Sequence, residues 1–263
     1  MNTYDRNFFA DLSDLSGITA SVLAPMLVDW FHPSSAIDVG CGVGSWAAAI
    51  KRAGVSRVRG VDGAWVPRNQ LLISQEEFED INLESPPAIR ERFGLAVCLE
   101  VAEHLPAEAA DNLVDYLCHL SDVVVFSAAI PGQGGTSHKN EQWPTYWVRK
   151  FADRDYAVRD VLRPILFPRN TPDYWYAQNA MLFLSGRAVR EYGAQLPQSD
   201  WKGMSVVHPG QLLSATKKVR IHPRQWLAYT ARRLAIDLVD RLRGKTIRFD
   251  EQEQTLLRKI ATY

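Results

Sequence analysis

The stretch DVGCGVG at 38–44 constrains the fold more than any other part of the sequence. It follows a short β-rich run that begins at 35, and it precedes a helical pattern over 45–53. Its three glycines permit positive φ angles and a close approach of the backbone to a ligand. A strand, a glycine-rich turn and a helix in this order are typical of a nucleotide-cofactor site at the carboxyl edge of a parallel sheet.

The rest of the central region alternates β-rich runs with helical patterns, which predicts a doubly wound α/β fold. A continuous apolar run, 95–99, is typical of a central parallel strand that is buried on both faces. Helices are expected near 107–119 and 142–152, and a proline-rich loop is expected over 163–176. The expected strands cover 35–40, 57–61, 77–81, 95–99, 122–128, 156–162 and 177–185.

Composition narrows the class of protein. The 263 residues hold 30 Lys or Arg against 30 Asp or Glu, so net charge alone would not bind nucleic acid. No apolar run reaches the roughly 18 residues that cross a bilayer, and the first twenty residues lack a secretory pattern. The three cysteines are widely spaced and odd in number, as expected of buried thiols. We therefore expect a cytoplasmic protein.

Acidic residues near the glycine-rich turn indicate which cofactor it binds. Asp62 ends the second expected strand, where a carboxylate can accept both hydroxyls of a ribose. Asp80 ends the third expected strand, where a carboxylate can accept from an adenine amino group. Asp38 precedes the turn, and Ser45 stands where a dinucleotide motif would have its third glycine. This arrangement suits a cofactor that has a cationic amino-acid end better than it suits the phosphates of a dinucleotide.

Four segments in this order resemble the class I S-adenosylmethionine-dependent methyltransferases: AIDVGCGVGSW (36–46), VRGVDG (58–63), FEDINLES (78–85) and AVCLEVAEHLP (96–106). The resemblance implies a Rossmann-like sheet of seven strands whose last strand is antiparallel. It also implies that S-adenosylmethionine is the cofactor. The methionine moiety would lie on Asp38, Gly40 and Gly42, the ribose on Asp62, and the adenine on Asp80 and Ile81, with Cys41, Gly63 and Leu99 completing the set.

A second cluster of polar residues follows the fourth and fifth expected strands. Glu100, Glu103 and His104 would come together on one helical turn, and His138 lies in the next loop. Two or more carboxylates and imidazoles on adjacent strand ends can bind one cation such as Mg²⁺ or Mn²⁺. The ExxEH pattern is similar to that of ubiquinone-pathway O-methyltransferases and small-RNA terminal 2′-O-methyltransferases. His138, followed by Glu141, is a looser match to the latter.

Two other interpretations of this cluster stay open. His138 or His104 could act as a general base without a metal, because an imidazole titrates near neutral pH. Alternatively, a glutamate could cap a helix while the histidine packs structurally. In either catalytic case Glu100, His104 and His138 are the candidate catalytic residues.

The segments 134–151 and 173–183 resemble methyltransferases met among bacterial polysaccharide, lipopolysaccharide and natural-product genes. This resemblance implies a small-molecule acceptor, foremost a sugar or glycan hydroxyl. The alternatives are N- or O-methylation of a natural product, 2′-O-methylation of RNA, and a cofactor-sensing protein without activity. The candidate acceptor contacts are Trp143, Tyr146, Trp147, Tyr176 and Asn179.

The chain divides into three expected zones: an N-terminal helical cover over 1–34, the cofactor-binding domain over 35–190, and an extension over 191–263. Residues 217–263 hold 12 Lys or Arg against 5 Asp or Glu. Within the extension, 223–243 has leucines at helical spacing and is expected to form an amphipathic helix. Such a helix packs on its own domain or forms a homodimer; contact with a membrane surface or an anionic carrier is the second interpretation. The absence of a stacking motif disfavours nucleic acid.

Overall fold

The computed structural model describes residues 6–89, 91–166, 173–196 and 207, with side chains from Ser16 onward. The α-helices are α1 (Arg6–Phe31), α2 (Ser45–Arg52), α3 (Ala110–Leu120), α4 (Pro144–Ala152), α5 (Leu162–Leu166), α6 (Tyr174–Asn179) and α7 (Gly186–Tyr192). The 3₁₀ helices are η1 (Arg68–Gln70), η2 (Gln75–Glu77), η3 (Ala102–His104) and η4 (Ala107–Ala109). The strands are β1 (Ser35–Val39), β2 (Arg57–Asp62), β3 (Phe78–Asp80), β4 (Leu95–Leu99), β5 (Val123–Ser127), β6 (Tyr156–Arg159) and β7 (Met181–Ser185).

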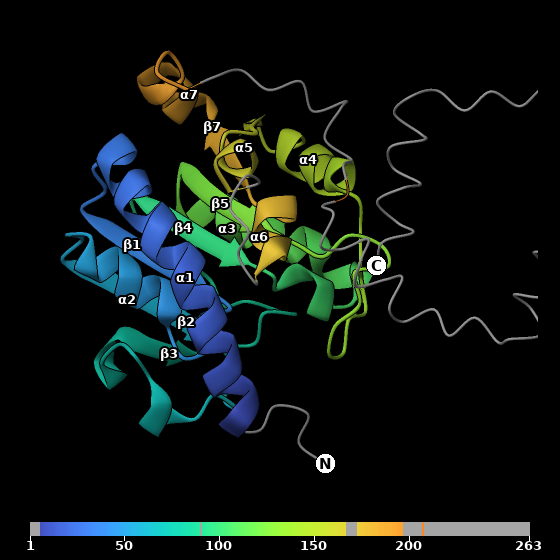
Figure 1. The fold of residues 1–263 in the computed structure, drawn as a ribbon. Coiled ribbons are helices and arrows are strands. Elements are labelled where there is room, and N and C mark those ends of the chain that lie inside the picture. The colour runs from blue at the N-terminus through green and yellow to red at the C-terminus, as the bar shows by residue number, and fades with distance from the viewer. Residues whose placement is uncertain (1–5, 90, 167–172, 197–206, 208–263) are drawn as a thin grey trace, which may run out of the picture. The chain divides into compact units, whose positions relative to one another are not determined.

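These strands form one sheet in the order β3-β2-β1-β4-β5-β7-β6 (Figure 1). The strands β1 to β5 pair in parallel, whereas β7 is antiparallel to both β5 and β6. The order reverses between β1 and β4, and such a switch point opens a crevice at the carboxyl edge of the sheet. The predicted doubly wound, seven-stranded α/β fold with an antiparallel last strand is therefore confirmed.

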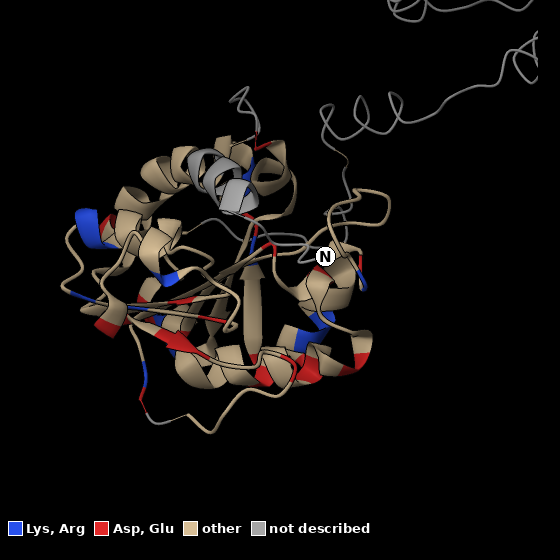
Figure 2. Cartoon of the chain, turned by 90° about the horizontal axis from the view of Figure 1, so that it is seen from below, with Lys and Arg blue, Asp and Glu red and all other residues tan. Residues whose placement is uncertain are grey.

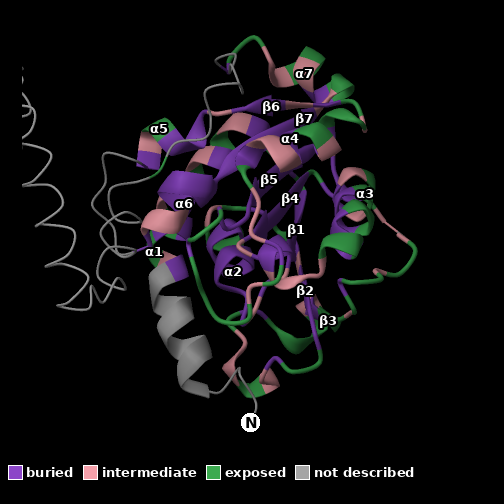
Figure 3. Cartoon of the chain, turned by 90° about the vertical axis from the view of Figure 1, so that its right-hand side faces the viewer, coloured by how far each residue is buried: buried purple, intermediate pink, exposed green. Residues whose placement is uncertain are grey.

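Two apolar layers cover the sheet. The first joins β1, β4, β5 and β7 to α1, α2, α6 and α7. The second joins the opposite faces of the strands to α3 and α4. Figure 3 shows α1 and α3 on opposite sides of the strands, and every residue of β1, β4 and β5 is buried. Because both faces are covered, the central strands consist of continuous apolar runs rather than alternating ones.

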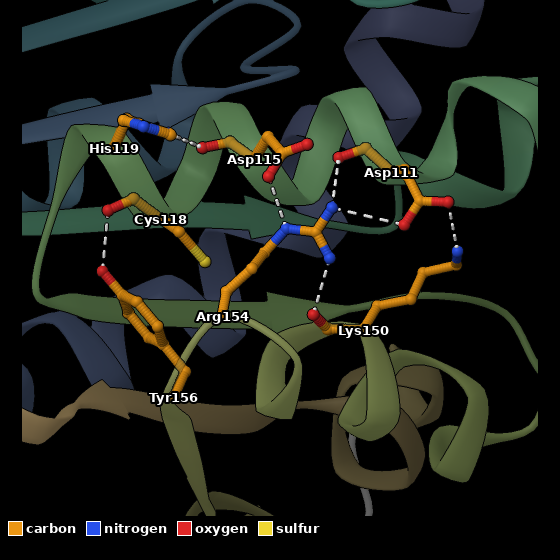
Figure 4. A network of polar contacts seen from close by, with 7 residues as sticks. All are labelled: Asp111, Asp115, Cys118, His119, Lys150, Arg154 and Tyr156. Carbon is orange, nitrogen blue, oxygen red and sulfur yellow. Dashed lines mark hydrogen bonds and ion pairs between the residues drawn. The ribbon is translucent and has the colours of Figure 1, made fainter.

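Charged residues, unlike the apolar ones, lie mostly outside the two core layers (Figure 2). Most Lys, Arg, Asp and Glu residues lie on the outer helices and on the loops around the sheet. On the α3–α4 side, the Arg154 guanidinium bonds Asp115 at 2.6 Å and Asp111 at 3.3 Å (Figure 4). Nearby, the Tyr156 hydroxyl donates to backbone oxygens of Cys118 and Ser121. These contacts tie α3 to α4 and to β6.

The segment 163–185 differs from expectation. The sequence predicts a loop followed by a strand from 177, but the structure has α5 and α6, and β7 begins only at Met181. Tyr176 and Ala177 bury in the first apolar layer, so tertiary packing overrides the β propensity of this aromatic run. Helix α1, Arg6–Phe31, lies within the range 1–34 expected for the N-terminal helical cover.

The expected amphipathic helix over 223–243 lies outside the described residues, as does nearly all of the extension over 191–263. Within the described part of the chain, no helix has both the length and the apolar character needed to cross a membrane.

Candidate functional site

The glycine-rich turn joins β1 to α2 at the carboxyl edge of the sheet. Gly40, Gly42 and Gly44 all have positive φ, at +75°, +53° and +88°. A Cβ atom on Gly40 would lie 2.3 Å from a methyl carbon of Val101, so only glycine fits between the turn and the β4 loop. The turn therefore exposes backbone rather than side chains to the crevice.

The Asp62 carboxylate lies at the end of β2 and faces this turn. Its Oδ2 accepts from the Gly42 amide at 2.7 Å, and its Oδ1 accepts from the Gly63 amide at 2.6 Å. Burial raises the pKa of Asp62, and these two hydrogen bonds act in the opposite direction. A carboxylate has about four acceptor positions, so Asp62 can still accept from ligand hydroxyls.

Asp38 lies on β1 beneath the turn and is 4% exposed. Its Oδ2 accepts from the Ala47 amide at 3.2 Å, near the start of α2. Burial raises the pKa of Asp38 to about 7, and the neighbouring charge of Asp62 adds to the effect. A buried carboxylate with a raised pKa gains stability when a cationic group binds beside it.

The remaining cofactor candidates lie around the same edge. Cys41 and Leu99 are buried, and burial raises the pKa of the Cys41 thiol well above its usual range. The Ile81 amide donates to the Asp62 carbonyl at 2.8 Å. Asp80 is exposed and forms an ion pair with Arg68, so its carboxylate already has a cationic partner.

Trp65 is a residue that sequence reasoning passed over. Its ring is 55% exposed, and a Cβ on Gly63 would lie 2.2 Å from the ring. The indole therefore covers the backbone of Gly63 beside the Asp62 carboxylate. An aromatic residue three positions after Asp62 was the available signal, but the sequence did not reveal which way the ring points.

Glu100 follows β4 in a left-handed conformation with φ +56°. Its amide donates to Ser127 Oγ at 3.0 Å, which fixes the backbone between β4 and β5. Its carboxylate accepts from Gln133 Nε2 at 2.8 Å and from Asn179 Nδ2 at 3.0 Å. Burial raises the pKa of Glu100, while its hydrogen bonds lower it. Glu100 thus belongs to a buried network of amides from α6 and the loop after β5.

Glu103, His104 and His138 form a tighter group. One ligand atom from each of the three lies within 4.8 Å of the others, and the two imidazole rings are 4.9 Å apart at nearly a right angle. Glu103 is fully buried, and neither of its carboxylate oxygens makes a hydrogen bond of ordinary length to the described residues, although the Ala129 backbone and the Glu100 carboxyl group lie close enough to influence its pKa. Glu100 is not part of this group, since its carboxylate is directed to the amide network.

Electrostatics set the protonation of this group. Burial raises the pKa of Glu103 well above its usual range, and the nearby charge of Glu100 raises it further. Burial lowers the pKa of His104 to about 4, and His138 adds to the effect, so His104 is neutral near pH 7. His104 Nδ1 is buried without a partner in the described part of the chain. A neutral imidazole beside a buried carboxylate is suited to receive a cation.

The five candidate acceptor contacts separate into two sets. Trp143 is 41% exposed, Tyr146 is half-buried, and Asn179 is buried in the amide network with Gln133 and Glu100. Trp147 and Tyr176 differ from expectation because both rings pack in the core. Trp147 is 1% exposed against Phe126, and the Tyr176 hydroxyl lies 3.0 Å from Ser16 Oγ of α1.

Comparison with known proteins identifies the fold but not a close relative. No protein-family model matches the chain, and no curated protein matches it. DesVI of Streptomyces venezuelae is similar in structure, with TM-score 0.51 and 12% identity, over 70% of this chain and 99% of that protein. An O-methyltransferase family protein from Burkholderia thailandensis gives TM-score 0.50 and 13% identity, over 70% of this chain and 61% of that one.

Magnesium protoporphyrin IX methyltransferase from Synechocystis PCC 6803, solved with bound SAH, is also similar, with TM-score 0.48 and 17% identity. The match covers 65% of this chain and 83% of that protein. At such identities a likeness in structure establishes the fold and leaves the acceptor open. The strand order and the first two likenesses agree: the described part of the chain has a Rossmann-like α/β fold, which it shares with these two proteins.

Proposed function

We propose that this chain is an S-adenosylmethionine-dependent methyltransferase that methylates a hydroxyl oxygen of a small molecule. The observation that carries the proposal is the position of Asp62, whose carboxylate faces Gly42 at the switch point of the sheet. The methyl donor supplies an electrophilic methyl group on sulfur, so the protein needs to align the acceptor and manage one proton.

The residues of the cofactor edge fit this donor. Asp62 would accept from the ribose hydroxyls, and Asp80 with Ile81 would meet the adenine. Asp38 would lie near the cationic amino-acid end, which fits its raised pKa in the absence of a cationic neighbour. Trp65 would cover the ribose side, because its ring already lies over Gly63.

We further propose a divalent cation of the Mn²⁺ or Mg²⁺ type on Glu103, His104 and His138. The fit rests on the buried Glu103 oxygens, which make no hydrogen bond of ordinary length to the described residues, on the neutral His104 ring and on the 4.8 Å spacing of the ligand atoms. Two imidazoles favour Mn²⁺ over Mg²⁺. Bound there, the cation would lower the pKa of an acceptor hydroxyl. Glu100, named with this set from the sequence, would instead hold the amide network in place.

A route without a metal uses His138 as the base. His138 Nδ1 lies 2.9 Å from Glu141 Oε1, so the other ring nitrogen can accept a proton from the acceptor hydroxyl. His104 is less suited to this role, because a pKa of about 4 makes it a weak base. Both routes place the reacting oxygen at the loop that carries His138.

A sugar or glycan is the acceptor that the surrounding groups favour. Gln133 and Asn179 present buried amides beside Glu100, and Asn179 Oδ1 has no partner among the described residues. Amides and carboxylates recognise hydroxyl groups, while the exposed Trp143 ring and the half-buried Tyr146 ring could stack on sugar faces. A natural product bearing several hydroxyls is the alternative, and an RNA ribose is a second one.

The test combines binding and transfer. Calorimetry with S-adenosylmethionine should give saturable binding to the purified full chain, and absence of binding would refute the cofactor assignment. Labelled methyl transfer is then measured to nucleotide sugars, bacterial glycans, hydroxylated natural products and short RNA, with EDTA and with Mn²⁺. Transfer to glycans or sugars supports the acceptor proposal. Transfer to RNA or natural products alone would keep the enzyme class and exclude the sugar.

The partner predictions for the extension, namely homodimerisation or contact with a membrane surface or carrier, concern residues outside the described part and stay predictions. The cytoplasmic location is likewise a prediction.

A further inference from the structure

The loop after β5, residues 131–142, is organised around the carboxylate of Glu141. Glu141 Oε2 accepts from the Gly132 amide at 2.7 Å. Glu141 Oε1 accepts from the Gly134 amide at 2.8 Å, and it lies 2.9 Å from His138 Nδ1. Three polar groups of one loop therefore converge on a single side chain.

The glycines of this loop make the convergence possible. Gly132 and Gly134 have φ of +82° and +65°, a backbone conformation that aims both amides at the Glu141 carboxylate. Gly135 lies directly against the His138 ring, since a Cβ there would be 2.2 Å from Nε2. The ring of His138 is thus held on one edge by Glu141 and on another by the Gly135 backbone.

Carboxylate oxygens only accept hydrogen bonds when ionised, so His138 Nδ1 must carry the hydrogen that Glu141 receives. A neutral histidine has one ring hydrogen, and fixing it on Nδ1 leaves a lone pair on Nε2. Resting on the proposed function, we propose that Glu141 is a positioning residue. It fixes the His138 tautomer so that Nε2 can bind a cation or accept the acceptor proton.

Glu141 also bonds the amides of Gly132 and Gly134, but the loop has other attachments that do not involve Glu141. The amides of Lys139 and Asn140 donate to the Glu103 carbonyl at 2.7 and 3.0 Å, and the Gln142 amide donates to Ala129 at 3.1 Å. These backbone bonds attach the loop to the 102–104 turn and to the end of β5 without Glu141. Loss of the Glu141 carboxylate should therefore change the state and orientation of the His138 ring more than the path of the chain.

The direct test is nitrogen NMR of the imidazole rings in the labelled full-length protein near pH 7.5, with His138→Asn identifying the signals. The wild type should show His138 with hydrogen on Nδ1. Glu141→Ala should shift the population toward hydrogen on Nε2, the form that a solvated histidine prefers. Glu141→Gln should stay close to the wild type, because its amide oxygen can still accept from Nδ1. A wild-type ring with hydrogen on Nε2, or a tautomer unchanged in Glu141→Ala, would overturn the proposal.

Cation affinity gives a second readout. Changing a residue that orients a metal ligand typically weakens binding by about 10- to 100-fold. We expect Glu141→Ala to weaken Mn²⁺ binding by that factor in calorimetry, and Glu141→Gln to weaken it less. Glu84→Gln is the matched control, since Glu84 pairs with Lys139 of the same loop at 3.4 Å without touching His138. An equal loss in Glu84→Gln would contradict a role through His138.

The two proposals can fail separately. In one outcome, the wild type binds no Mn²⁺, but its His138 carries the hydrogen on Nδ1 and Glu141→Ala removes that preference. The positioning role of Glu141 would then stand, and the cation proposal would be refuted. If Mn²⁺ binds while His138 carries its hydrogen on Nε2, the cation proposal stands and the positioning role falls.

Discussion

Asp62 Oδ2 accepts a hydrogen bond from the amide of Gly42 at 2.7 Å, although twenty positions separate the two residues in the sequence. The bond joins the end of β2 to the glycine-rich turn after β1. It holds the carboxylate at the point where the turn exposes its backbone. The proposed ribose acceptor is therefore also a structural part of the turn that would hold the methionine moiety.

Asp62→Ala should weaken S-adenosylmethionine binding in calorimetry by at least about 10- to 100-fold. Each hydrogen bond to a charged group contributes about 1.5–3 kcal/mol, and the turn would lose its own bond as well. Asp62→Asn separates the effects: its amide oxygen can accept from Gly42, while the charge and one acceptor oxygen are lost. Unchanged affinity in the alanine variant would exclude Asp62 from the ribose site.

Asp38→Asn should stabilise the cofactor-free protein at pH 8. The same substitution should abolish the additional stability that the wild-type protein gains when S-adenosylmethionine binds. Burial raises the pKa of Asp38 from 3.8 to about 7. Between these values the folded state holds a proton that the unfolded state has released, so stability falls as pH rises from about 4 to 7. At about 1.4 kcal/mol per pKa unit, this shift of roughly 3 units corresponds to a penalty on the order of 4 kcal/mol.

The measurement is denaturant unfolding at pH 5 and pH 8. Asparagine can accept from the Ala47 amide but carries no charge, so the gain over wild type should grow with pH across this range. A variant no more stable than wild type at pH 8 would contradict the burial penalty. Asp29→Asn, at an exposed position of α1, is the matched control and should not be more stable than wild type at pH 8.

Glu103→Gln should lower Mn²⁺ affinity by more than about 100-fold, because loss of a ligand exceeds the loss from a supporting residue. It should not destabilise the metal-free protein, because it removes a buried carboxylate whose oxygens make no hydrogen bond of ordinary length to the described residues. Glu108→Gln, at an exposed position of η4, is the control. EDTA should abolish turnover, and Mn²⁺ should restore it. Full turnover after chelation would exclude the cation and favour the route in which His138 acts as the base.

Local signals of the sequence predicted much of this architecture. The turn at 38–44 and the apolar run at 95–99 depend on residues close in the chain, and β1, α2 and β4 follow the expected pattern. The cluster of Glu103, His104 and His138 could be anticipated because parallel strands end at one edge of the sheet.

Structural features that depend on contacts between residues far apart in the chain could not be predicted from the sequence. Whether 174–179 forms a strand or a helix depends on packing against α1 and α2, more than a hundred residues away. The sequence grouped Glu100 with Glu103, but Gln133 and Asn179 draw the Glu100 carboxylate to a different network. The direction of an aromatic ring is decided by the same long-range packing, as Trp143, directly before α4, and Trp147, within α4, illustrate.

Trp143 and Trp147, one turn apart, should respond oppositely to alanine. Trp147 is 1% exposed against Phe126, so Trp147→Ala should lower the free energy of unfolding by about 3–5 kcal/mol. Trp143 is 41% exposed and makes no side-chain cap for α4, so Trp143→Ala should change stability by at most about 0.5 kcal/mol. With a sugar acceptor it should raise the acceptor KM and leave S-adenosylmethionine affinity unchanged. An unaltered KM would remove Trp143 from the acceptor site, and a large loss of stability would show that its ring is structural.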